Sequence, residues 1–260
     1  MIATIPLDVQ QKQESNSVQL SLSPTQVKNL MALLEKNEFY DLLKTIEEQV
    51  QTDTIFMPKS FQDFSLRDVE EQLELTIVRT ELFTTVPPLK VNNLLLQVLE
   101  MNKLVPLKSE KARSESMVFP VLVNMVARHK AAFTLFSGEK FEVDKTKGLT
   151  GYCDYLLCNK SDTYLITAPV FAIVEAKKAD VEEALGQCAA AMVAAKRFNE
   201  NHQSAYPTIY GVATSGKEWQ FLQLKGNHLY IDEISYFEKT ELEKIVGILE
   251  VIVGEFLEKI

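Results

Sequence analysis

Hydrophobic positions follow two different patterns along the chain. After a polar stretch over residues 1–22, they recur at helical spacing, which is typical of amphipathic helices. We expect such helices from Pro24 onward and over about residues 38–50, 65–80 and 92–102. These segments predict a helical N-terminal region, residues 1–105, that packs on the rest of the chain or binds a partner.

In the second part, residues 106–260, segments with helical spacing of the hydrophobic positions occur together with segments typical of β-strands. Ser109–His129 predicts a long amphipathic helix, although Pro120 would kink it or move its start. Strands are expected over residues 140–144, 152–158, 170–174, 208–214 and 218–224, with helices over 180–198 and 240–258. This order predicts an α/β fold with a mixed sheet flanked by helices.

The stretch Val170–Lys178 joins a buried strand to charged residues. Val170 to Val174 are all apolar, which predicts a strand buried on both faces. Glu175 and Lys177 follow, and the two-residue period of a strand sends both side chains to one face. Burying a carboxylate and an ammonium there costs free energy unless they have a use. Two charged residues at the end of a buried strand therefore indicate a functional site. The alternative interpretation is that Glu175 and Lys177 form an ion pair at the end of the strand.

Asp154 lies inside another apolar strand, 21 residues before Glu175. If the two strands are neighbours, the carboxylates meet and offer hard oxygen ligands to a divalent ion such as Mg²⁺. That ion would polarise a phosphoryl oxygen and help a water lose its proton, while Lys177 would orient the water or offset developing charge. Glu115 could add an acidic contact, and Gln187 could position water or substrate. Taken singly, Asp154 could instead cap a turn and Gln187 could be a solvated helix position.

The net charge and the cysteine content bear on which ligands and which cellular compartment we expect for this protein. A net charge of −9 argues against a protein that binds nucleic acid over its whole surface, although residues 108–147 carry a local excess of three positive charges. The three cysteines show no Cys-x-x-Cys spacing and are expected to be buried, reduced thiols. With neither a spanning segment nor a signal peptide in the pattern, we expect a cytoplasmic protein without membrane contact.

The spacing of these residues resembles the PD-(D/E)xK nuclease superfamily. The matching stretches are Gly151–Asp154, Ile173–Lys177 and Gln187, followed by Ala213–Leu222, which resembles the strand-turn-strand of one branch. That branch is the nuclease domain at the N-terminus of type I restriction enzyme motor subunits. The resemblance covers about residues 109–225 and implies a restriction-endonuclease-like sheet in residues 106–260.

The resemblance also implies roles for individual residues. Asp154, Glu175 and Lys177 take the signature positions, and the backbone carbonyl of Ala176 is a further ligand of Mg²⁺ or Mn²⁺. Glu115 is preferred to Glu110 as the acid of the helix, because the apolar stripe begins just after it. Cys153 stands where the motif has proline, a change that does not touch the metal.

Two functions from different classes follow. The first is a free-standing, metal-dependent nuclease that hydrolyses phosphodiester bonds in nucleic acid, with DNA as the expected substrate. The second is a non-catalytic nuclease-fold protein that serves as a protein- or nucleic-acid-binding module, with the helical N-terminal region as its protein-binding part. Pairing of two chains into a homodimer stays open.

Overall fold

In the computed structural model, the described residues are 59–177 and 180–260. The chain divides into two compact units, residues 1–56 and 57–260, and the fold described below is that of the second unit. The helices expected from Pro24 and over residues 38–50 lie outside the described residues.

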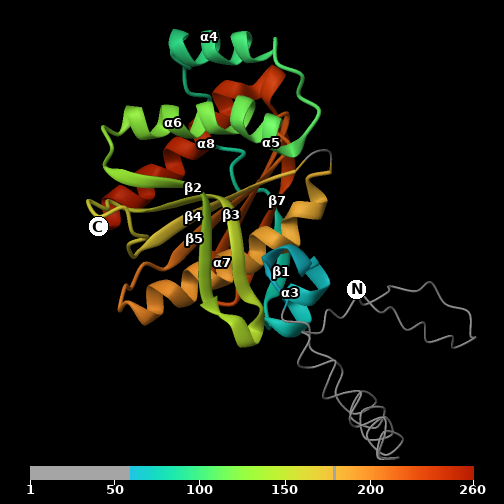
Figure 1. Ribbon diagram of the computed structural model, residues 1–260, viewed down its shortest axis with the longest axis vertical. Helices are drawn as coiled ribbons and strands as arrows, with labels where there is room; N and C mark the ends of the chain where they lie inside the picture. Colours follow the sequence, from blue (N-terminus) through green and yellow to red (C-terminus); the bar gives the residue numbers. More distant parts are fainter. Residues whose placement is uncertain (1–58, 178–179) are drawn as a thin grey trace, which may run out of the picture. The chain divides into compact units, whose positions relative to one another are not determined.

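A seven-stranded mixed sheet forms the centre of the unit, with strand order β1-β7-β6-β5-β4-β3-β2 (Figure 1). The strands are β1 (Thr76–Thr80), β2 (Phe133–Asp144), β3 (Leu149–Asn159), β4 (Val170–Ala176), β5 (Thr208–Thr214), β6 (Glu218–Lys225) and β7 (His228–Phe237). The β1–β7 and β4–β5 pairs are parallel, and the other pairs are antiparallel. The predicted α/β fold with a mixed sheet flanked by helices is confirmed.

Helices cover both faces of the sheet. They are α3 (Leu66–Gln72), α4 (Asn93–Asn102), α5 (Glu110–Arg113), the π-helical turn η2 (Ser114–Val118), α6 (Phe119–Arg128), α7 (Glu182–Asn201) and α8 (Glu238–Lys259), with short 3₁₀ turns η1 (Phe61–Asp63) and η3 (Lys145–Lys147). One hydrophobic core joins α7 and α3 to the sheet, and a second joins α4, α6 and α8 to its other face. Within the described part of the chain, no helix is long and apolar enough to cross a membrane.

The helix expected over residues 65–80 is wrong in its second half. Ser65 and Asp68 form a capping box at the start of α3. The Ser65 hydroxyl oxygen accepts the Asp68 N–H, and the Asp68 carboxylate accepts the Ser65 N–H. Glu74 then adopts a positive φ of 57°, which ends the helix, and the chain continues as β1. Because β1 pairs with β7, residues that were expected in a helical N-terminal region belong to the sheet.

The expected helices at 92–102 and 109–129 are present. Asn92 caps α4 by accepting the Leu95 N–H at 2.8 Å. Pro120 is accommodated because η2 precedes it and places it in the first turn of α6, where a missing N–H costs little. The long helix therefore runs as α5, η2 and α6 in succession.

Small side chains let α7 lie close to its neighbours. Ala189, Ala190 and Ala191 are fully buried against the sheet. At Gly186, an added Cβ would lie 2.1 Å from the carbonyl oxygen of Phe64, so the backbone just before α3 contacts the helix directly. This packing fixes α7, which carries Gln187, above the ends of β3 and β4.

Candidate functional site

Asp154 and Glu175 meet at the end of adjacent strands. β3 and β4 pair in antiparallel register with Tyr155 opposite Val174, so one step further along both strands brings Asp154 opposite Glu175. The carboxylate Oδ2 of Asp154 accepts the backbone N–H of Ala176 at 2.7 Å. Opposed side chains of an antiparallel pair lie within contact distance on one face. The structure thus brings together the two carboxyl groups that the sequence singled out.

Glu175 is completely enclosed, with a relative exposure of 0%. Its Oε2 accepts a hydrogen bond from Nε2 of Gln187 at 2.7 Å. Its Oε1 is buried and has no hydrogen-bond donor among the described residues. A buried carboxylate oxygen without a partner is costly, so this atom is where a proton or a cation would stabilise the site.

The charges around Glu175 also favour a proton or a cation on its carboxyl group. Burial raises the pKa of Glu175 well above its ordinary value, and the charge of Asp154 raises it further, whereas the ammonium of Lys177 opposes the shift. Both effects favour a proton or a cation on Glu175.

Lys177 and Ala176 complete the end of β4. Lys177 is partly exposed, and its backbone N–H donates to the carbonyl oxygen of Thr214 at 2.7 Å. Ala176 is buried and pairs with Thr214 of β5. The turn that follows Thr214 is held by Trp219, whose Nε1 donates to the Gly216 carbonyl at 3.1 Å. Trp219 is itself fully buried in the core.

Glu115 is not brought into this cluster. It lies on η2 with its side chain 63% exposed, and its carboxylate is 3.8 Å from Nζ of Lys111. Among the described residues, no group of three or more His, Cys, Asp or Glu side chains is arranged to hold a metal ion. The side-chain ligands that the site itself offers are the carboxyl groups of Asp154 and Glu175.

Two features beside the pair were not singled out from the sequence. The thiols of Cys153 and Cys188 lie close enough to Glu175 for its charge to raise the pKa of each, after the larger effect of burial. All three cysteines are buried and free, as their spacing predicted. The hydroxyl of Tyr155 donates to the Ser114 carbonyl at 3.0 Å, which ties η2 to the strand that carries Asp154. Sequence spacing gives no signal for either contact.

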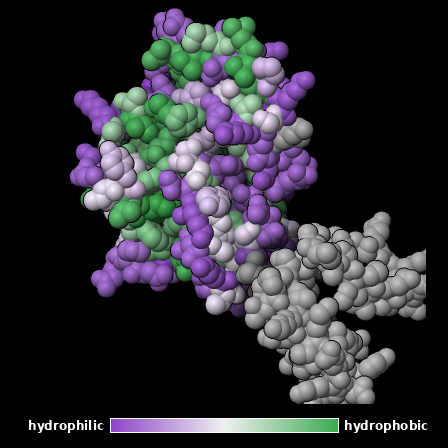
Figure 2. Space-filling view, viewed as in Figure 1, coloured by the Kyte–Doolittle hydropathy of each residue, from purple (hydrophilic) through white to green (hydrophobic). Residues whose placement is uncertain are grey.

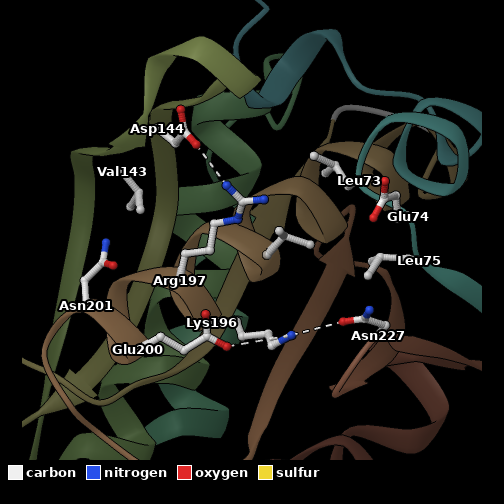
Figure 3. A pocket seen from close by; sticks show the side chains of 11 residues that line it. Leu73, Glu74, Leu75, Val143, Asp144, Lys196, Arg197, Glu200, Asn201 and Asn227 are labelled. Atoms are coloured by element: carbon white, nitrogen blue, oxygen red, sulfur yellow. Dashed lines mark hydrogen bonds and ion pairs between the residues drawn. The ribbon is translucent and has the colours of Figure 1, made fainter.

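A separate polar pocket of about 440 Å³ lies along the C-terminal half of α7 (Figure 3). Its two cations are already paired: Arg197 lies 2.9 Å from Asp144, and Lys196 lies 3.2 Å from the Asn227 amide oxygen. Glu74 and Glu200 add further negative charge to its wall. None of the predicted site residues lines this pocket.

The fold and the site define a class: an α/β protein with a seven-stranded mixed sheet and, at the β3–β4 end, a fully buried carboxyl group beside a partly exposed one. Comparison with protein families, curated proteins and solved structures finds no match for the chain.

Proposed function

We propose that the chain is a metal-dependent nuclease that hydrolyses phosphodiester bonds in nucleic acid, with DNA as the expected substrate. The observation that carries the proposal is the buried Oε1 of Glu175, which has no donor among the described residues, in a carboxyl group beside that of Asp154. A structural carboxyl in a core would have both oxygens satisfied, whereas a ligand keeps one oxygen for its ion.

The donor set suits a hard divalent cation. Asp154 and Glu175 supply carboxylate oxygens, and the Ala176 carbonyl is the third expected ligand; Mg²⁺ and Mn²⁺ favour such oxygen donors. With few protein ligands, such an ion keeps waters, and it would supply Lewis-acid polarisation of a phosphate and a more acidic water.

The chain's own residues would orient and stabilise the reactants. The Ala176 N–H fixes the Asp154 carboxylate, and Gln187 fixes one oxygen of Glu175 and leaves the other without a donor among the described residues. Lys177, at the partly exposed end of β4, would hold the attacking water or offset charge on the phosphate. Lys178 lies outside the described residues.

A cation titration combined with a cleavage assay tests the proposal. After chelation, Mg²⁺ and Mn²⁺ should raise the melting temperature of the full chain and support cleavage of plasmid or single-stranded DNA. Glu175→Gln should lose both responses, and Lys177→Ala should lose cleavage while it keeps cation binding. Cleavage that persists in both variants would remove Glu175 and Lys177 from the mechanism.

Asp232 provides a matched control. It is also a fully buried carboxyl, but its oxygens accept hydrogen bonds from the Leu82 and Ile234 N–H groups and from the Tyr236 hydroxyl. Asp232→Asn should therefore lower stability yet leave the cation response unchanged. Loss of the response in this control would show that general destabilisation, and not ligand loss, explains the Glu175 variant.

The second candidate is a non-catalytic nuclease-fold module that binds protein or nucleic acid. Two observations favour it: Glu175 is completely enclosed, and Glu115 has an exposed side chain beside Lys111, so that only the carboxyl groups of Asp154 and Glu175 remain for an ion. Binding of DNA that needs no divalent cation, without cleavage of DNA or RNA under any cation, would support this module over the enzyme.

A further inference from the structure

Tyr152 is an exposed aromatic residue next to the candidate site. It lies in β3, two residues before Asp154, and it is 67% exposed. Tyr155, Tyr210 and Tyr236 also lie in the sheet, but each is only 2% exposed and is hydrogen-bonded through its hydroxyl group. Tyr152 therefore presents its ring to solvent, whereas these three tyrosines fill the core.

The ring of Tyr152 projects from the uncovered face of the β2–β3 hairpin. The next residue, Cys153, is 1% exposed and belongs to the core that joins α7 to the sheet. Because side chains alternate along a strand, Tyr152 points to the opposite face. It lies opposite Lys140 of β2, which is also exposed. Figure 2 shows this hairpin as mostly hydrophilic.

Two lysines next to Tyr152 share a single carboxylate. Oε2 of Glu142 lies 2.9 Å from Nζ of Lys140, and Oε1 of Glu142 lies 2.9 Å from Nζ of Lys145. Both lysine side chains are more than half exposed. Alternation along β2 sends Glu139 to the other face, so this group of three side chains keeps one positive charge. An aromatic ring beside exposed cations is the combination that binds single-stranded nucleic acid, since the ring stacks on a base and the cations meet phosphates.

The position of Tyr152 along β3 places it within one nucleotide of the carboxyl site. A strand rises about 3.4 Å per residue, so the backbones of Tyr152 and Asp154 are about 7 Å apart. A phosphate attached to a nucleotide stacked on Tyr152 would thus be within reach of Asp154. Bases inside a duplex are stacked on their neighbours, and turning one out costs free energy that an unpaired strand does not spend.

We propose that Tyr152 stacks on an unpaired base of the substrate, so that the substrate is single-stranded nucleic acid. Lys140 and Lys145 contact its phosphates on the hairpin side. The inference rests on the proposed function, because it takes the carboxyl groups of Asp154 and Glu175 as the reacting end of the site. DNA and RNA share the base and the phosphate that this surface recognises, and oligonucleotides of both kinds distinguish them.

Binding of a single-stranded oligonucleotide that contains the fluorescent base 2-aminopurine tests the stacking. The titration uses the full chain in chelator, so that cation-dependent cleavage does not interfere. Wild type should quench the fluorescence, and Tyr152→Ala should abolish the quenching and raise the dissociation constant on the order of 10-fold. Tyr152→Phe keeps the ring and should behave as wild type. Tyr164→Ala is the matched control, since Tyr164 is 87% exposed in the β3–β4 loop, and it should also behave as wild type.

The charges of the hairpin give a second, independent measurement. Lys140→Gln should weaken binding and reduce the slope of its salt dependence by about one. Glu142→Gln should tighten binding, because it leaves both lysines without their carboxylate. Circular dichroism should show that all of these variants fold.

Competition with a duplex of the same sequence tests the preference for an unpaired strand. The duplex should bind more weakly than the single strand, and Tyr152→Ala should remove most of this difference. Equal binding of both forms, no binding of the single strand, or quenching that Tyr152→Ala leaves intact would overturn the inference. Quenching that depends on Tyr152 without any cleavage would remove the nuclease and keep the stacking, whereas cleavage that is insensitive to Tyr152→Ala would do the reverse.

Discussion

The backbone N–H of Ala176 donates to the carboxylate of Asp154 at 2.7 Å. This bond ties the acidic residue of β3 to the end of β4, directly after Glu175. It also leaves Glu175 as the enclosed partner with an unsatisfied oxygen.

The stability of the protein should depend on pH through Glu175. Its pKa is raised above the ordinary value of 4.5, so the folded state holds a proton that the unfolded state releases, and stability falls as pH rises through the interval above 4.5. Glu175→Gln removes this loss. In chelator, the variant should gain in melting temperature relative to wild type between pH 5 and pH 8. A difference that is the same at both pH values would contradict the raised pKa.

Adding a third carboxyl group should strengthen cation binding. Gln187 donates to Oε2 of Glu175, and Gln187→Glu would replace that donor with a like charge. In chelator, the variant should be less stable by about 1–3 kcal/mol, since it loses a buried hydrogen bond. Mn²⁺ should recover more stability in the variant than in wild type. Gln187→Met, which lacks both donor and charge, should lose stability without this recovery.

Asn199 should be a structural anchor of β4. Its side chain accepts the Val170 N–H at 2.7 Å and donates to the Val170 carbonyl at 2.8 Å, at the start of the strand. Asn199→Ala leaves both buried groups unpaired and should cost about 2–4 kcal/mol in urea unfolding. Asn201, exposed at the end of the same helix, is the control, and its alanine variant should change stability by less than about 0.5 kcal/mol.

Two helical glycines should respond in opposite directions to alanine. At Gly186, the new Cβ would meet the Phe64 carbonyl at 2.1 Å, so α7 must move away from the chain before α3. We expect Gly186→Ala to lose at least about 2 kcal/mol of folding free energy. At Gly254 in α8, nothing lies within 4 Å, and alanine should gain up to about 1 kcal/mol from its helix propensity. Thermal unfolding of both variants measures the contrast, and a stabilised Gly186→Ala would contradict the close contact.

Local sequence determined the elements whose signals are contained within a few residues. The capping box at Ser65, the cap at Asn92 and the fully apolar run of β4 each place an element correctly. The strands β1 and β7 were not predicted. β1 is five residues long and partly exposed at the sheet edge, and it is held by its pairing with β7, which lies about 150 residues away in the chain.

For the candidate site, the sequence determined which residues carry the chemistry and in what order they occur. The charges in and after apolar strands were sufficient to single out Asp154, Glu175 and Lys177, because a charge in a buried strand is costly wherever the fold places it. Gln187 was named from its place in the helix that follows. The tertiary structure alone decided which of them meet. Strand register puts Asp154 opposite Glu175, α7 brings Gln187 onto one oxygen, and η2 leaves Glu115 at the surface. Those distances depend on long-range pairing and packing, which the pattern along the chain does not contain.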